Sequence, residues 1–196
     1  MKARSHYTLN DVTITTYKSC DDATRAAFKT WALSLKPELD GGEYGAGDDG
    51  EPLPNSAYLW VLQHNASPEF TDDGLYQTFI VCDRETGEFL ATGTIVPDDR
   101  DIAKKYNIPG LGFWGFVNVR RDLRGRGLGK LISAYMDEHV QLFVDVSGKS
   151  ADFSLFTANE YAVRIYKGFG FKFVRQVFIE EFDSTEDLYT KTYVPR

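Results

Sequence analysis

The sequence predicts a single domain of the mixed α/β (α+β) class, in which helices cover a mixed β-sheet. Three observations support this class. The length of 196 residues suits one domain, and a hydrophobic share of 42% is enough for a sizeable core. Segments that have the period of strands also alternate along the chain with segments that have the period of helices.

The N-terminal part of the chain predicts a strand followed by a helix. Residues 12–17 are rich in β-branched side chains, which favour a strand. Apolar side chains then recur at helical spacing from Asp21 to about Leu35. Ser19 is placed to cap this helix, and Pro37 stops it.

A long loop is expected over residues 40–56, which are rich in glycine and acidic side chains, and a short apolar segment follows at 58–62. Loops of this length inside a compact domain are commonly functional. The loop is therefore a candidate part of a binding site.

The middle of the chain predicts a hairpin, a central strand and a long helix. Residues 78–82 and 89–96 pair across a turn in which Gly87 supplies backbone freedom. Residues 112–119 are apolar on both faces, which is typical of a central strand. The helix runs from about 127 to 146, and its expected buried stripe comprises Leu128, Leu131, Ile132, Tyr135, Leu142 and Phe143.

The last third predicts further strands around a short helix. Residues 152–158 form a strand, and a helix at 160–167 ends at Gly168. A long strand at 171–182 and its antiparallel partner at 188–194 complete the chain.

Composition excludes several classes of function. A formal charge of −7 disfavours nucleic-acid binding, which needs a basic face, and modestly favours a cationic substrate. The three histidines show no metal-ligand spacing, and the two cysteines imply no disulfide framework. No run of about 18 apolar residues occurs, so no contact with membranes is expected. The N-terminus lacks an apolar signal core, which favours a cytoplasmic protein.

The most informative stretch runs from Val117 to Lys130, where a strand leads through a glycine-rich turn into an amphipathic helix. The first N–H groups of a helix have no partner within the helix and carry partial positive charge, so they can bind a phosphate. A P-loop would need glycine at Arg124, and a dinucleotide fingerprint would need glycine or alanine at Lys130 or Ile132. Both alternatives fail on spacing.

The spacing that remains resembles the signature of the GNAT superfamily of acetyl-CoA-dependent N-acetyltransferases, R/Q-x-x-G-x-G/A, with Arg124, Gly127 and Gly129 in the defined places. The resemblance implies that backbone amides of the loop bind the CoA pyrophosphate. It also implies that the preceding strand pairs with the pantetheine arm. The expected cofactor-binding residues are Phe116, Val117, Asn118, Val119, Arg124, Gly125, Arg126, Gly127, Leu128, Gly129 and Lys130. We expect aspartate at Gly127 or Gly129 to abolish CoA binding and leave the fold intact.

A second match to the same superfamily lies downstream. Its later motif fits Asn159, Ala162, Tyr166 and the pair Gly170-Phe171. The resemblance covers roughly residues 75–182 as an acyl-CoA-binding core, with acceptor-side elements at about 18–74. It implies one N-acetyltransferase domain over residues 1–196, with a mostly antiparallel sheet flanked by helices.

The resemblance also assigns chemical roles. Tyr166 would protonate the leaving thiolate, and Asn159 would contact the CoA arm, although a helix cap also suits Asn159. Strand 112–119 carries no carboxylate, unlike members with a glutamate there, so no general base is assigned. The open candidates are a water chain and the carboxylates of Glu43, Glu160, Glu180 and Glu181.

The implied activity is transfer of an acetyl group from acetyl-CoA to an amine of a small molecule or protein, without a metal. Tyr44 and the segment Tyr58-Leu59-Trp60, with the acidic loop, can bind a cationic acceptor. A non-catalytic CoA-binding or regulatory module of the same fold is the alternative. The sequence leaves the acceptor open, and a monomer and a homodimer are both compatible with it.

Overall fold

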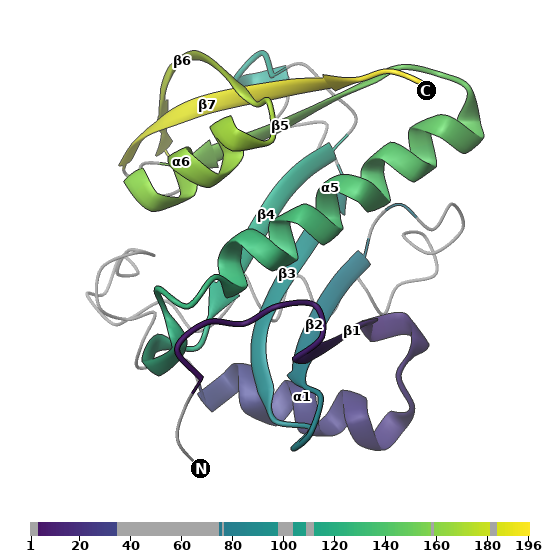
Figure 1. Ribbon diagram of the computed structural model, residues 1–196. Coiled ribbons are helices and arrows are strands. Elements are labelled where there is room, and N and C mark those ends of the chain that lie inside the picture. The colour runs from purple at the N-terminus through teal and green to yellow at the C-terminus, as the bar shows by residue number, and fades with distance from the viewer. Residues whose placement is uncertain are drawn as a thin grey trace.

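A computed structural model describes residues 4–34, 75, 77–97, 104–108, 112–157, 159–180 and 184–196. The expected alternation of strands and helices is present (Figure 1). The elements in chain order are β1 (Val12–Thr16), η1 (Tyr17–Ser19), α1 (Asp22–Ser34), β2 (Gln77–Asp83), β3 (Phe89–Pro97), β4 (Gly112–Val119), η3 (Arg121–Leu123), α5 (Leu128–Ser147), β5 (Ala151–Thr157), α6 (Glu160–Gly168), β6 (Lys172–Ile179) and β7 (Ser184–Tyr193). The long loop and the apolar segment expected at 40–62 lie outside the described residues.

One seven-stranded sheet has the order β1-β2-β3-β4-β5-β7-β6. All neighbours are antiparallel except β4 and β5, which are parallel. Strand β4 lies in the middle, as its apolar sequence predicted. The expectation of a mostly antiparallel sheet flanked by helices is thus confirmed, and β6 and β7 are antiparallel partners as expected.

The two faces of the sheet pack against different helices because side chains alternate along each strand. On β2, Phe79 and Val81 join the core under α5, whereas Ile80 and Cys82 join the cluster under α1. Helix α5 comes so close to β3 that a Cβ at Gly93 would lie 2.6 Å from the sulfur of Met136. Glycine is therefore needed there for close helix–sheet contact.

The buried stripe of α5 differs from the sequence prediction. Tyr135 and Leu142 are 41% and 59% exposed, respectively. The fully buried positions recur every four residues, at Leu128, Ile132, Met136, Val140 and Val144. Each step of four advances by about 40° on a helix with 3.6 residues per turn, so the stripe winds around the axis. This winding follows the diagonal path of α5 across the twisted sheet (Figure 1).

Two helix ends also differ from the prediction. Ser19 belongs to η1, and the carboxylate of Asp21 instead accepts a hydrogen bond of 2.7 Å from the amide of Thr24 at the start of α1. Helix α6 includes Gly168, and the left-handed residue beyond its end is Gly170, with φ of +90°. A short polar cap at the start of α1 and a glycine after α6 were thus correctly expected, but each lies two positions beyond the residue predicted.

Candidate active site

Strands β4 and β5 pair over only two positions among the described residues, Gly112 with Phe153 and Phe113 with Ser154. The rest of β4, up to Val119, is therefore not paired with β5 by any described residue. On its other edge β4 pairs with β3. The register of this pairing shifts between Thr92, which pairs with Asn118, and Thr94, which pairs with Gly115, so a bulge lies there. A strand edge with unpaired backbone groups can pair with an extended ligand.

The phosphate loop, defined as residues 124–130, lies beyond this edge, at the start of α5. Gly125 and Gly127 have φ of +78° and +88°, a conformation that suits glycine. The amide of Leu131 donates to the carbonyl of Gly127 at 3.0 Å. The amides of Leu128, Gly129 and Lys130 precede this first helical bond, so they have no acceptor within the helix. They form a cradle suited to an anion.

The three basic side chains of the phosphate loop have different surroundings. The Nε atom of Arg124 donates to the carbonyl of Val119 at 3.3 Å, which joins the loop to the end of β4. The Nη1 atom of Arg126 donates to the carbonyl of Arg4 at 2.9 Å. Lys130 is exposed on the first turn of α5. Arg126 thus holds the N-terminal segment, a contact that the sequence did not predict.

The N-terminal segment, residues 4–7, lies beside the phosphate loop (Figure 1). The amide of Tyr7 donates to the carbonyl of Arg126 at 2.9 Å. The ring of His6 covers Gly127, where a Cβ would lie 2.4 Å from the nearest ring carbon. An aspartate at Gly127 would displace His6 and occupy a left-handed conformation, so we expect it to lower stability, where the sequence alone indicated an intact fold.

Gly129 differs from Gly127 in this respect. A Cβ at Gly129 would lie 3.6 Å from Ile165 and 3.8 Å from Val119, which are ordinary contact distances. Gly129 therefore tolerates a side chain, and it lies where α5, α6 and the end of β4 meet.

Asn159 and Tyr166 of the second motif lie at the start of α6 and within it. The Oδ1 atom of Asn159 accepts hydrogen bonds from the amides of Tyr161 and Ala162, at 2.9 and 3.3 Å, and so caps the helix. Tyr166 is 8% exposed, and its ring centroid lies 5.9 Å from that of Phe171. Because Ile165 approaches Gly129, α6 lies next to the phosphate loop.

Asn118 is a polar side chain within an otherwise apolar strand. It is 6% exposed, and its Nδ2 atom is buried without a hydrogen-bond partner. A buried amide left unpaired costs about 1–3 kcal/mol. Sequence reasoning considered only the backbone at this position, although one polar residue in the run Phe-Val-Asn-Val was a signal.

The described candidates for the general base are both surface residues. Glu160 faces Arg164 at 3.7 Å, and Glu180 pairs with Lys105 at 2.8 Å. Glu43 and Glu181 lie outside the described residues, as do Tyr44 and the segment 58–60. No general base is assigned.

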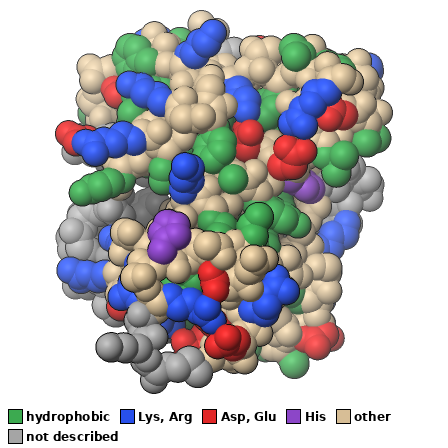
Figure 2. All heavy atoms as spheres, in the orientation of Figure 1, with side chains coloured by type: hydrophobic (Ala, Val, Ile, Leu, Met, Phe, Trp, Pro, Cys, Tyr) green, Lys and Arg blue, Asp and Glu red, His purple; other side chains and the backbone are tan. Residues whose placement is uncertain are grey.

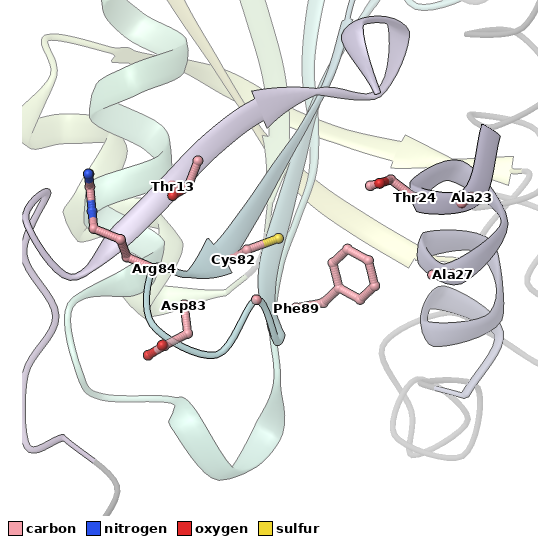
Figure 3. Close-up of a pocket in the computed structure, with 9 residues that line it drawn as sticks. Thr13, Ala23, Thr24, Ala27, Cys82, Asp83, Arg84 and Phe89 are labelled. Carbon is pink, nitrogen blue, oxygen red and sulfur yellow. The ribbon is translucent and has the colours of Figure 1, made fainter. Parts of the chain in front are cut away.

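A separate hollow of about 540 Å³ lies between α1 and the β2–β3 hairpin (Figure 3). Cys82 and Phe89 point toward α1 in this hollow, on the face of the sheet opposite α5 (Figure 3). Burial raises the pKa of the Cys82 thiol to about 11, with a smaller contribution from Cys20, so the thiol stays protonated near neutral pH. Both cysteines are free, and the hollow contains none of the predicted site residues.

Two features are absent from the described part of the chain. It contains no cluster of three or more His, Cys, Asp or Glu side chains that could hold a metal ion. No described helix is long and apolar enough to span a membrane. Acidic and basic side chains lie interspersed on the face drawn in Figure 2.

Solved structures with the same fold are acetyltransferases of low sequence identity. A phosphinothricin acetyltransferase of the GNAT superfamily from Sinorhizobium meliloti, in complex with acetyl-CoA, has a TM-score of 0.62 at 14% identity, over 94% of this chain and 89% of that chain. A GNAT-family acetyltransferase from Streptococcus pneumoniae has a TM-score of 0.58 at 19% identity, over 93% and 99% of the two chains. A chain of the NatC complex bound to Gag peptide and CoA has a TM-score of 0.53 at 19% identity, over 95% and 99%.

At these identities the structures show a shared fold. No curated protein sequence gives a significant match. The model of the acetyltransferase (GNAT) family, however, matches residues 47–171, which include β4, the phosphate loop and α6. The chain therefore belongs to the GNAT acetyltransferase family.

Proposed function

We propose that this protein is an N-acetyltransferase that moves an acetyl group from acetyl-CoA to an amine. The observation that carries the proposal is the parting of β4 from β5 next to the phosphate loop. A strand edge that no described residue of β5 pairs therefore lies next to an anion cradle, at the C-terminal end of β4. These are the two features that a long ligand with a phosphate end and an amide-containing arm requires.

The donor would lie along β4 with its phosphates at α5. Amides of Leu128, Gly129 and Lys130 suit the pyrophosphate because they lack intrahelical acceptors. Residues 116–119 of β4, which no described residue of β5 pairs, suit the amide groups of the pantetheine arm. The hydrogen bond from Arg124 to the carbonyl of Val119 fixes the position of the cradle relative to this edge of β4.

Acetyl transfer then forms a C–N bond and breaks a C–S bond. The neutral amine nitrogen attacks the thioester carbon, and the nitrogen loses a proton to water. The sulfur leaves as a thiolate that needs a proton, and we assign its delivery to the Tyr166 hydroxyl. A phenol has a reference pKa of about 10, so it carries its proton near neutral pH and can donate it as the C–S bond breaks. Transfer to a thiolate whose thiol has a reference pKa of about 8.5 is uphill by about 2 kcal/mol, and the phenolate regains its proton from solvent.

Ligand-dependent melting tests the donor site. A ligand that binds only the folded state raises the melting temperature, and at equal concentration the ligand with the lower Kd raises it more. CoA and acetyl-CoA should raise it more than NAD or ATP at equal concentration. A larger shift with NAD than with CoA would reject the proposed donor.

Turnover separates the enzyme from a non-catalytic CoA-binding module. Release of free thiol from acetyl-CoA should rise in the presence of suitable amines, as followed with a thiol reagent over an amine panel. Binding of CoA with no thiol release by any amine would instead favour the module, for which the missing carboxylate on β4 is the supporting feature.

A further inference from the structure

Strand β6 is the last strand of the sheet, next to β7, and no described residue pairs with its outer edge (Figure 1). An edge strand offers a row of unpaired N–H and C=O groups with which another strand can pair. Three large apolar side chains of β6 are also exposed: Phe173 by 51%, Val174 by 46% and Phe178 by 53%. Because burial of such side chains is favourable, this edge is suited to pair with another chain.

The sequence of this edge is symmetric about its centre. Residues 173–178 read Phe-Val-Arg-Gln-Val-Phe, so Phe and Val recur in reverse order. Two copies of one strand that pair antiparallel about a two-fold axis would therefore bring like residues together. Residues opposite each other must, however, project from the same face of the sheet. In a regular strand Phe173 and Phe178 would project from opposite faces, because they are an odd number of residues apart.

A bulge in β6 removes this conflict. Phe173 lies opposite Tyr189 of β7 and Phe178 lies opposite Thr185, so five steps along β6 match four steps along β7. The extra residue is Val174, where the register shifts. Tyr189 and Thr185 are an even number of residues apart and share one face of the sheet. Phe173 and Phe178 therefore share that face as well.

We propose that a second copy of this chain pairs with the outer edge of β6, about a two-fold axis at Gln176, and so continues the seven-stranded sheet through both copies. In this register Phe173 faces Phe178 of the second copy on one face of the sheet. On the other face the bulged Val174 faces Val177 of the second copy. Each contact occurs twice because the axis relates the two copies. The inference concerns assembly and does not depend on the proposed acetyl transfer.

The charges of the strand suit the same register. Lys172, before the paired segment, lies beside Glu180 of the second copy, so opposite charges meet at both ends of the strand pair. The guanidinium of Arg175 donates to the carbonyls of Tyr106 and Asn107, which hold it against its own chain. The residue on the axis, Gln176, is neutral and meets its own copy. Charge therefore favours this pairing.

The size of the contact sets its strength. Stable interfaces bury about 1,200–2,000 Å² in total, and smaller ones are weak and transient. The proposed strand pair spans only residues 172–179. We therefore expect a reversible dimer, with a Kd of about 1–100 µM, that separates on dilution.

Sedimentation velocity at rising protein concentration tests the pairing. The average mass of the wild type should rise from that of a monomer toward twice that value between about 1 µM and about 300 µM. Phe178→Lys places a charge opposite Phe173 of the second copy and should weaken the association by at least about tenfold. Because Phe178 is exposed, this variant should fold, which circular dichroism checks. A wild type that stays monomeric, or a folded variant that associates as strongly, would overturn the proposal.

A cysteine at the axis tests the register and needs no loss of binding. Opposite residues of an antiparallel pair have Cα atoms about 4.5–5.5 Å apart, which a disulfide can span. Gln176→Cys should therefore give a cross-linked dimer on mild oxidation, seen in a nonreducing gel. The matched control is Val146→Cys on α5, which is 82% exposed and lies outside the proposed contact. Cross-linking of Gln176→Cys no stronger than that of the control or the wild type would overturn the register.

Discussion

Gly129 is the residue of the phosphate loop at which a charge can be added with least strain. Its Cβ position has only ordinary contacts, and it lies in the first turn of α5, where a negative side chain stabilises a helix. Gly129→Asp should therefore keep or raise the melting temperature while its charge repels the pyrophosphate. We expect CoA affinity to fall by at least about tenfold, or about 1.4 kcal/mol, in calorimetry.

Gly129→Ala is the control for volume without charge. Alanine is favoured over glycine in helices by about 1 kcal/mol, so this variant should be at least as stable as the wild type. If the wild type and Gly129→Asp bind CoA with equal affinity, the phosphates of CoA do not bind at the start of α5.

A substitution at Tyr166 tests which group protonates the leaving thiolate. Tyr166→Phe removes one hydroxyl and preserves the ring that packs against Phe171. Since general acid catalysis contributes about 10²–10⁴-fold, kcat should fall by that order with nearly unchanged CoA affinity. Full kcat in Tyr166→Phe, under conditions where chemistry limits the rate, would leave Tyr166 with a packing role only.

At the scale of elements, Asn159 connects the stability of α6 with the proposed donor site. Its Oδ1 atom caps two amides of α6, so Asn159→Ala should lower the free energy of unfolding by about 0.5–2 kcal/mol in urea denaturation. Asn159→Asp keeps a capping oxygen but loses the amide donor. If Asn159 also contacts the CoA arm, the aspartate variant should retain stability and bind CoA more weakly.

The two variants distinguish the roles of Asn159. Wild-type CoA affinity in Asn159→Asp, together with wild-type stability, would show that the residue acts as a cap alone.

At the scale of the whole molecule, Asp137 joins α5 to β7, which lies on the far side of β5 from β4. Asp137 accepts a hydrogen bond of 2.6 Å from the hydroxyl of Tyr193 and pairs with Lys191. Burial, with a further contribution from Asp137, raises the pKa of Tyr193 above the usual value for a phenol.

This raised pKa has a predictable effect on stability. A folded-state pKa above the unfolded value of about 10 means that the contribution is complete below pH 10 and is lost as the pH rises above it. The wild-type melting temperature should therefore fall above about pH 10, and that of Tyr193→Phe should fall less steeply. Parallel curves for the two proteins, measured by circular dichroism, would contradict the role of Tyr193.

Local sequence determined most elements and the candidate donor site. The β2–β3 hairpin, β4 and α5 were predictable because side-chain periodicity reports which face of an element is buried. The glycine-rich turn at residues 124–130 was predictable because Arg124, Gly127 and Gly129 stand at a fixed spacing between a strand and a helix, and its binding of phosphate stays a prediction. These features depend on residues close together in the chain, so the sequence alone contains the information.

Tertiary structure decided what depends on distant residues. It placed β7 between β5 and β6, parted β4 from β5, and set His6 over Gly127. It also buried the amide of Asn118 without a partner. Periodicity reports that a face is buried and not which segment covers it, so strand order and contacts across more than a hundred residues, such as Arg126 with Arg4, emerge only when the chain is folded.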